Sequence, residues 1–209
     1  RGTGKTSSAK IFAKALNCLH TVNGSPCNEC ESCLSFKDSP DIIEIDAASN
    51  NGVDEIRELI NNVKLVPSSS KYKVYIIDEV HMLTTSAFNA LLLTLEEPPS
   101  HVVFILATTD IQNVPITILS RCQRFDFKPI NKDSLINRLK YVCKEEKINV
   151  TDEALEEIAL ISAGGMRDAL SILDQCVSYA IDGIRIEDVS EIYGLVSSEE
   201  LITMLRLIH

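Results

Sequence analysis

Apolar, β-branched runs alternate with amphipathic helical segments up to about residue 128, and this alternation limits the possible folds most strongly. It predicts strands over Ile42–Asp46, Val74–Asp78 and Val102–Ala107, of which the last two are almost uninterrupted apolar runs. Such runs are typical of strands that are covered on both faces of a parallel sheet. Amphipathic helices are predicted between the strands, over Val53–Val63 and Ser86–Leu95. We therefore expect an α/β layered domain with right-handed crossovers.

The pattern changes after Pro129, where helical periodicity replaces the alternation. Polar residues at Asn131 and Thr151 are typical N-caps, and helices are predicted over Ser134–Lys144, Asp152–Ser162 and Met166–Ala180. We accordingly expect one domain over residues 1–130 and a three-helix domain over 131–193. A further helical start over 194–209 predicts a third domain that is cut short, and the start at Arg1 predicts a missing N-terminal segment.

Composition excludes several classes of protein. With 45% apolar residues in 209, the chain can bury a core, so wholesale disorder is excluded. Its apolar runs fall far short of the ~20 residues that span a bilayer. The net charge of −10 requires any nucleic-acid contact to be a local patch. We expect a soluble cytosolic protein that does not contact membranes.

A phosphate-binding loop is indicated at the start of the chain. Gly4-Lys5-Thr6 is the end of the P-loop pattern GxxxxGK[ST], whose first glycine would precede Arg1. In such a loop backbone N–H groups and the lysine bind phosphates, and the Thr6 hydroxyl binds Mg²⁺. A glycine-rich turn that caps a helix is the alternative. The predicted nucleotide-binding residues here are Gly2, Thr3, Gly4, Lys5, Thr6 and Ser7.

Two carboxylates follow the strand Val74–Asp78 and make the P-loop interpretation stronger. Asp78 would hold Mg²⁺ together with Thr6, and Glu79 would polarise the attacking water. An acidic turn at a strand end is common when it stands alone. Here it lies in the same predicted α/β domain as the loop, so we expect a nucleoside triphosphatase.

Four cysteines cluster at the spacing C-x₈-C-x₂-C-x₂-C over residues 18–33. Four thiolates suit a closed tetrahedral Zn²⁺ site, which has no open position for catalysis. An iron–sulfur cluster or redox thiols are the alternatives. The predicted zinc ligands are Cys18, Cys27, Cys30 and Cys33, whereas Cys143 and Cys176 are expected in the core of the helical region.

Taken together, these motifs resemble the AAA+ clamp-loader ATPases, and among them the gamma/tau subunits of bacterial DNA polymerase III. The resemblance covers almost the whole chain. It is carried by the four-cysteine insert, by the runs Glu44–Asn50 and Gly52–Arg57, and by the runs Asp78–Leu83 and Leu95–Pro99.

The resemblance implies roles for three further residues. Thr109 matches the sensor 1 position beside the γ-phosphate, and Arg167 matches sensor 2 on a lid helix. Arg121 in Ser120-Arg121-Cys122 matches the arginine finger that acts on the neighbouring subunit's nucleotide. Without the resemblance, both arginines would be ordinary surface or salt-bridge residues. The catalytic residues are thus expected to be Lys5, Glu79 and, in trans, Arg121.

The implied function is that of an ATP-hydrolysing motor subunit that loads the sliding clamp onto primer–template DNA. Implied cofactors are ATP, Mg²⁺ and structural Zn²⁺, and implied partners are the delta and delta-prime subunits and further gamma/tau copies. DNA contact is expected at most weakly, at Asn50, Asn51 and Arg57, and a hydrophobic Leu93 is expected to be packed or idle rather than bound to DNA. A non-hydrolysing scaffold subunit like delta-prime and another AAA+ motor acting on DNA remain alternatives.

Overall fold

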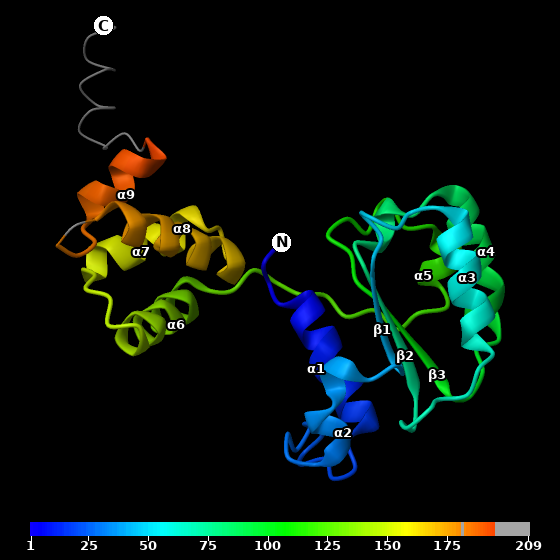
Figure 1. Cartoon of the computed structure of the whole chain (residues 1–209). Coiled ribbons are helices and arrows are strands. Elements are labelled where there is room, and N and C mark those ends of the chain that lie inside the picture. Colours follow the sequence, from blue (N-terminus) through cyan, green and yellow to red (C-terminus); the bar gives the residue numbers. More distant parts are fainter. Residues whose placement is uncertain (181, 195–209) are drawn as a thin grey trace, which may run out of the picture. The chain divides into compact units, whose positions relative to one another are not determined.

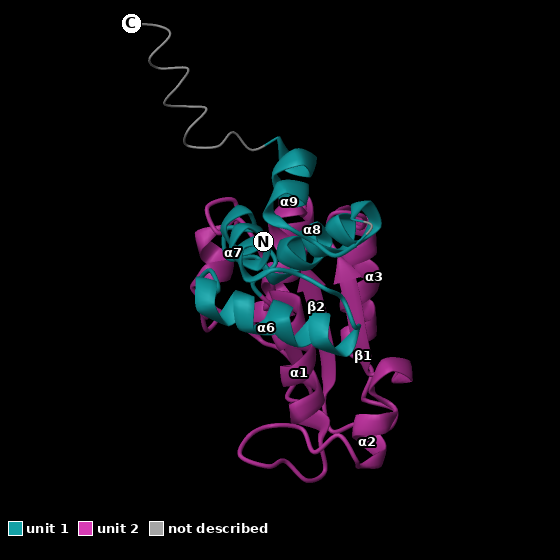
Figure 2. Cartoon of the chain, turned by 90° about the vertical axis from the view of Figure 1, so that its left-hand side faces the viewer, with its two compact units in different colours: residues 1–3, 127–209 teal, residues 4–126 magenta. Residues whose placement is uncertain are grey.

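The computed structural model describes residues 1–180 and 182–194 (Figure 1). These residues form two compact units, one of residues 4–126 and one of residues 1–3 with residues from 127 onward (Figure 2). The first three residues therefore pack with the second unit, although residues 1–130 were expected to form one domain. Each unit has its own hydrophobic core.

The α/β unit is built on a three-stranded parallel sheet of order β1-β2-β3. Its strands are β1 (Ile42–Asp46), β2 (Lys73–Asp78) and β3 (Val102–Leu106). The predicted α/β class with a parallel sheet is thus confirmed, and the three predicted strands lie within one residue of their observed ends. Because all strands run the same way, Asp46 and Asp78 lie side by side at the carboxyl edge.

Helices cover both faces of this sheet (Figure 1). On one face lies α1 (Lys5–Asn17), and on the other lie α3 (Val53–Val63) and α4 (Thr85–Glu96). The predicted helices between the strands are confirmed. Pro98 and Pro99 follow the end of α4, as expected from residues that cannot continue a helix.

The alternation of side chains along β2 explains why it reads as a continuous apolar run. Val74 and Ile76 pack in the cluster with Ala9 of α1, while Tyr75 and Ile77 pack in the cluster with α3 and α4. All four strand residues are at most 1% exposed. Successive side chains point to opposite faces, so a strand between two helical layers needs apolar residues throughout.

Four short elements of the α/β unit were not predicted. Each spans a single turn or less, which is too short for a periodic pattern to reveal. They are α2 (Glu31–Leu34), η1 (Phe36–Asp38), η2 (Val80–Met82) and α5 (Ile116–Leu119).

The helical unit contains α6 (Lys132–Glu145), α7 (Asp152–Ile161), α8 (Met166–Tyr179) and α9 (Ile186–Tyr193). Three of these helices were predicted, and α9 is a correction to the three-helix expectation. This helix has only eight residues, too few for a clear periodic pattern, and a capping box marks its start, in which the Asp188 carboxylate accepts from the Arg185 N–H at 2.8 Å.

Several details of the helical unit agree with the sequence analysis. The Asn131 and Thr151 side chains accept from backbone N–H groups three residues on, at 2.7 Å and 3.3 Å, as N-caps do. Cys143 and Cys176 are buried in its core. The predicted third domain lies outside the described residues except for Gly194. Among the described helices, none is both long and apolar enough to cross a membrane.

Candidate functional site

The start of α1 and the carboxyl end of β2 bring together the two predicted magnesium ligands, Thr6 and Asp78. The Thr6 hydroxyl donates to Asp78 Oδ2 at 2.6 Å, although the residues are 72 apart in sequence. Gly4 caps the helix at φ 91, in the left-handed region that glycine adopts without strain. Its carbonyl then accepts from the Ser8 N–H at 2.8 Å, which fixes the first turn.

The chemistry of this pair fits the predicted magnesium site. A hydroxyl and a carboxylate oxygen are the hard ligands that Mg²⁺ takes alongside phosphate oxygens. Lys5 and Thr6 begin α1, where free N–H groups and the helix dipole favour a negatively charged ligand. The second carboxylate oxygen of Asp78 accepts from the Glu79 N–H at 2.9 Å, so the carboxylate plane is held from the other side.

Glu79 and Thr109 also meet at the carboxyl edge of the sheet. Glu79 Oε2 accepts from the Thr109 hydroxyl at 2.8 Å and from the Thr109 N–H at 3.1 Å. The residues follow β2 and β3, which are neighbours in the sheet. The parallel order therefore places the predicted water-polarising carboxylate and the predicted sensor side by side.

His81 and Thr108 extend this group and were not singled out from the sequence. His81 Nδ1 lies 2.9 Å from Thr108 Oγ1 and 3.4 Å from Glu79 Oε2. Thr108 is next to Thr109 and His81 is two residues from Glu79, but only the adjacency of β2 and β3 shows that the two side chains touch. A sequence pattern carries no such information about contact.

Residues 1–3 of the predicted loop belong to the helical unit together with Arg167. The Gly2 carbonyl accepts from the Met166 N–H at 3.0 Å, at the start of α8. Gly2 has φ +70, and a Cβ there would lie 3.2 Å from Gly165 Cα, so glycine is required. Arg167 is exposed in the first turn of α8, and Thr3 is half-buried.

Arg121 lies just after α5 and is exposed, as a residue that acts on another chain must be. Its guanidinium donates to Glu96 Oε1 at 2.5 Å and to the Thr117 carbonyl at 2.6 Å. These contacts join it to the ends of α4 and α5 rather than to Asp78 or Glu79.

The four predicted zinc ligands come together in one cluster. Their sulfur atoms all lie within 4.8 Å of one another. The Cys18–Cys27 separation is 3.5 Å, and the Cys18–Cys30 and Cys27–Cys33 separations are 4.0 Å. A tetrahedral ion with Zn–S bonds of about 2.3 Å separates its ligands by roughly 3.8 Å, so the cluster fits Zn²⁺.

The local environment favours ionised thiols at two of these positions. Backbone N–H donation, from Cys27 first of all, lowers the pKa of Cys18, and donation from Leu19 lowers the pKa of Cys30 to about 6. Burial raises the pKa of Cys33 to about 12. A cation among the sulfurs would offset that cost, since only thiolates bind a metal well.

A tight turn brings the ends of the cysteine loop together. Val22 and Ser25 exchange two backbone hydrogen bonds, of 3.0 Å and 2.9 Å, across Asn23 and Gly24. Both turn residues have positive φ, of 51° and 79°, which is the geometry of a type I′ turn.

The residues predicted to contact DNA make intrachain contacts. The Asn50 N–H and side-chain amide both donate to the Asp46 carbonyl, at 2.9 Å and 3.1 Å. Asn51 accepts from the Thr84 N–H at 3.1 Å, and Arg57 pairs with Asp54 at 3.2 Å. Leu93, which is expected to be packed or idle, is 75% exposed on α4 and so does not pack within the chain.

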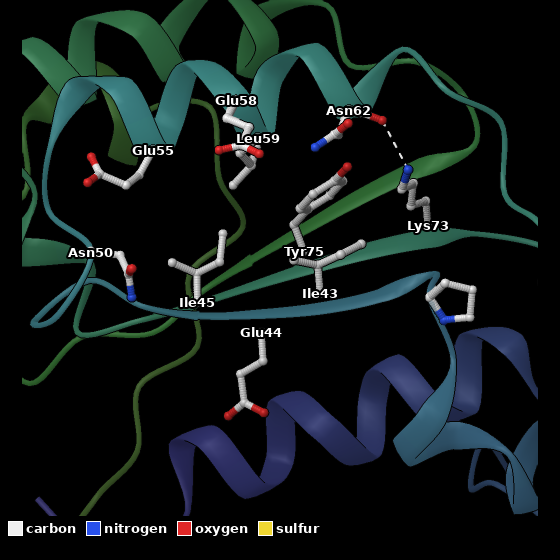
Figure 3. A pocket seen from close by; sticks show the side chains of 11 residues that line it. Ile43, Glu44, Ile45, Asn50, Glu55, Glu58, Leu59, Asn62, Lys73 and Tyr75 are labelled. Atoms are coloured by element: carbon white, nitrogen blue, oxygen red, sulfur yellow. Dashed lines mark hydrogen bonds between the residues drawn. The ribbon is translucent and has the colours of Figure 1, made fainter.

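A cavity of about 480 Å³ lies between β1, β2 and α3 (Figure 3). Lys73 crosses it and donates to the Asn62 carbonyl at 3.0 Å. None of the predicted nucleotide or metal ligands lines it, so the cavity is separate from the site at the carboxyl edge. Its lining residues are Pro40, Ile43, Glu44, Ile45, Asn50, Glu55, Glu58, Leu59, Asn62, Lys73 and Tyr75.

Two protein-family models match the chain. A model described as "DNA polymerase III, delta subunit" matches residues 1–131, and one described as "DNA polymerase III clamp loader subunit, ATPase lid domain" matches residues 134–182. Together they cover most of both compact units.

Curated relatives are similar over essentially the full chain. DNA polymerase III subunit tau of Bacillus subtilis is 54% identical over 100% of this chain and 38% of its own length. The tau subunit of Escherichia coli is 42% identical over 99% of this chain and 32% of its own length. The chain thus spans about a third of the length of each of these two relatives.

Solved structures with a similar fold include a RuvB mutant of Thermotoga maritima. The match has a TM-score of 0.63 at 17% sequence identity, and it covers 93% of this chain and 60% of the RuvB chain. The Thermotoga maritima RuvB "Holliday junction branch migration motor" gives a TM-score of 0.62 at 17% identity, over 91% of this chain and 57% of that chain. At this identity the likeness shows the fold alone.

Proposed function

The chain belongs to the DNA polymerase III clamp-loader family, with relatives among its gamma/tau subunits, and we propose that it is an ATP-hydrolysing motor subunit of that loader. The resemblance predicted from the motifs is confirmed. The proposal adds that ATP turnover by this subunit drives the loading of a sliding clamp onto primer–template DNA. The delta and delta-prime subunits and further copies of this chain complete the proposed assembly.

One observation carries the proposal: two pairs of side chains with complementary roles meet at the same edge of the sheet. Thr6 and Asp78 form the first pair, and Glu79 and Thr109 form the second. Hydrolysis of a triphosphate needs a metal at the phosphates and a carboxylate near the attacking water. Backbone hydrogen bonds link the loops after β2 and β3, because the Val80 N–H donates to the Ala107 carbonyl at 2.9 Å.

Each side chain then has a defined task. Lys5 and the N–H groups at the start of α1 bind the phosphates. Thr6 and Asp78 would hold Mg²⁺, which when bound would neutralise negative charge on the phosphates. Glu79 orients the attacking water. Thr109 donates to the terminal phosphate when its hydroxyl turns away from Glu79.

Arg121 is proposed to act on ATP held by a neighbouring subunit, and Arg167 on ATP held by its own. The Arg121–Glu96 pair supports the first assignment because it is easily exchanged. Its side chains are 33% and 44% exposed, and ion pairs this exposed contribute only about 0–1 kcal/mol. A phosphate group at a subunit interface would therefore compete well with Glu96 for the guanidinium.

The four-cysteine cluster is proposed to bind one Zn²⁺ for structure. Four sulfurs leave no open position, so the metal is not assigned a part in hydrolysis. A cytoplasmic location at the replication machinery follows from the proposed role. The weak DNA contacts of Asn50, Asn51 and Arg57 also remain proposals.

The experiment is to measure ATP turnover by the full-length chain assembled with its partner subunits, sliding clamp and primed DNA. Glu79→Gln should lower kcat by roughly 10²–10⁴-fold, as expected for loss of a catalytic base, with ATP affinity retained. Glu97→Gln, at an exposed acid beyond α4, is the matched control and should be fully active.

Equal turnover by Glu79→Gln and the unaltered assembly would contradict the proposal. It would favour the alternative in which the subunit is a scaffold that uses nucleotide only for stability. Strand separation or branch migration by the assembly would instead favour a motor acting on DNA junctions.

A further inference from the structure

His81 lies between the loops that follow β2 and β3. It belongs to η2 and its side chain is only 16% exposed. One ring nitrogen, Nδ1, lies 2.9 Å from the Thr108 hydroxyl and 3.4 Å from Glu79 Oε2. The imidazole thus touches both the proposed water-orienting carboxylate and the loop that carries Thr109.

Two oxygen atoms next to His81 Nδ1, those of the Thr108 hydroxyl and of Glu79 Oε2, bear on which ring nitrogen carries the proton. The hydroxyl has a single hydrogen, and it donates to the Asp110 carbonyl at 3.0 Å. The same oxygen accepts from the Asp110 N–H at 3.0 Å. With that hydrogen on the Asp110 carbonyl, the Thr108 oxygen accepts from His81, and the Glu79 carboxylate can only accept, so this arrangement favours the tautomer with the hydrogen on Nδ1. That hydrogen is shared with Glu79 Oε2, the second acceptor within reach.

Backbone hydrogen bonds fix the main chain of Glu79, whereas the position of its carboxylate depends on hydrogen-bond donors from neighbouring residues. Its φ is 47°, a left-handed conformation that is unfavourable for a non-glycine residue. Backbone bonds on either side fix it, since the Asp78 carbonyl accepts from Ala47 and the Val80 N–H donates to Ala107. Among the described residues, the Thr109 hydroxyl, the Thr109 N–H and His81 Nδ1 all lie at Oε2, and no hydrogen bond to Oε1 is found.

We propose that His81 is a positioning residue, whose Nδ1–H keeps Glu79 Oε2 in place so that Oε1 can orient the attacking water. This inference rests on the proposed ATPase function. When the Thr109 hydroxyl turns toward the terminal phosphate, Oε2 loses its 2.8 Å hydrogen bond. The Thr109 N–H and His81 then remain as its donors. His81 itself does not touch the substrate in this scheme.

Three substitutions at His81 separate positioning from packing. Asparagine places an N–H donor where Nδ1 stands, glutamine places one where Nε2 stands, and leucine has none. In the assembled, full-length loader, His81→Leu and His81→Gln should lower kcat about tenfold, which is the loss of one ordinary hydrogen bond. His81→Asn should stay within about twofold of the unaltered assembly on the same grounds. The KM for ATP should be unchanged in all three.

Several outcomes would overturn the inference. Full activity of His81→Leu would show that the donor is unnecessary, and equal loss in all three variants would show a packing role. If His81→Leu fails to fold, the comparison of asparagine with glutamine decides, because both are polar and similar in size. Equal kcat values for those two would then contradict positioning.

A second measurement does not depend on hydrolysis. Nitrogen NMR of the histidine-labelled full-length chain, at a pH where the ring is neutral, should show His81 protonated at Nδ1. The His81→Asn spectrum assigns the resonance. Protonation at Nε2 would overturn the inference even in an active enzyme. If the unaltered assembly fails to hydrolyse ATP while Nδ1 is protonated, the proposed function fails and only the geometric part stands.

Discussion

The two candidate sites of the α/β unit are built in opposite ways. At the carboxyl edge of the sheet, Thr6 meets Asp78 and Glu79 meets Thr109, and each pair joins elements far apart in sequence. The four-cysteine cluster comes from one continuous segment of residues 18–33. Apolar side chains around it are exposed: Leu19 is 64%, Val22 62% and Leu34 73% exposed.

The difference indicates what holds each site together. Buried apolar clusters and the β ladder position the edge of the sheet, so its side chains are in place before any ligand binds. The cysteine module has little apolar burial of its own, so the proposed metal is the expected source of its stability. The two sites should therefore respond independently when either is disturbed.

Removal of the metal should give the largest effect. Structural zinc contributes about 10–16 kcal/mol of apparent binding free energy to small domains. We expect one zinc per chain, and the double variant Cys30→Ser/Cys33→Ser should contain essentially none. Amide exchange should then lose its protection over residues 18–34, because the segment has no other core. ATP affinity should change by less than about twofold, since α1 and β2 keep their packing.

Cys143→Ser is the control for that experiment. It removes a buried thiol from the helical unit and should leave the zinc content at one per chain. Iron in place of zinc, or an ordered segment without any metal, would contradict the account. Loss of ATP binding in the double variant would show that the two sites are coupled after all.

The next effect concerns Asp41, which fixes the start of β1. Its buried carboxylate accepts from the N–H groups of Ser68, Ser69 and Ser70 at 2.7 Å, 2.9 Å and 2.9 Å. Asp41→Asn should lower the free energy of unfolding of the α/β unit by about 2–3 kcal/mol, because the amide leaves donors unpaired. Amide exchange in β1 and β2 measures it, and zinc content should be unchanged.

The Asp41 effect should also depend on pH. Burial alone would raise the pKa of Asp41, but the three N–H donors outweigh it and lower the pKa below its usual value. The folded pKa is then below the unfolded value of about 3.9, so the stabilisation is full above that pH. It is lost as the pH falls through the folded pKa, and the penalty of Asp41→Asn should shrink there. Asp126→Asn, at an exposed carboxylate, is the control and should show no such trend.

The smallest effect is expected at the Arg121–Glu96 pair. Glu96→Gln removes an exposed ion pair and should change the stability of the α/β unit by less than about 1 kcal/mol. Thermal unfolding measures the change. A loss several times larger would mean that Arg121 is held in place structurally, and the proposed exchange with a phosphate would be difficult.

The sheet and the longer helices could be predicted because periodicity marks them over many residues. Val53–Val63 is predicted with its observed ends, and the continuous apolar run of Val74–Asp78 correctly indicates a strand buried on both faces. Single-turn elements such as α5 and the short α9 give too few residues for a period. The grouping of residues 1–3 with the helical unit depends on contacts of Gly2 that no local pattern records.

In the candidate sites, too, local sequence patterns could be interpreted, whereas contacts that depend on strand adjacency could not. The cysteine cluster is local, so its spacing alone indicates which thiols meet. Thr6 and Asp78 could be paired because each matches a motif with a known role in phosphate chemistry. The contacts of His81 with Thr108 and Glu79 could not be predicted, since they arise from the adjacency of β2 and β3. The partner of Arg121 within the chain was likewise not foreseen.

The central claim is that ATP is hydrolysed by Glu79 of one copy together with Arg121 of its neighbour. Loaders assembled only from Arg121→Ala copies, or only from Glu79→Gln copies, should turn over ATP at less than roughly one-hundredth of the normal rate. Loaders assembled from a mixture of the two variants should regain at least about tenfold over either alone, because an intact Glu79 can then face an intact Arg121. No recovery in the mixture, or full activity of the Arg121→Ala assembly, would contradict the claim.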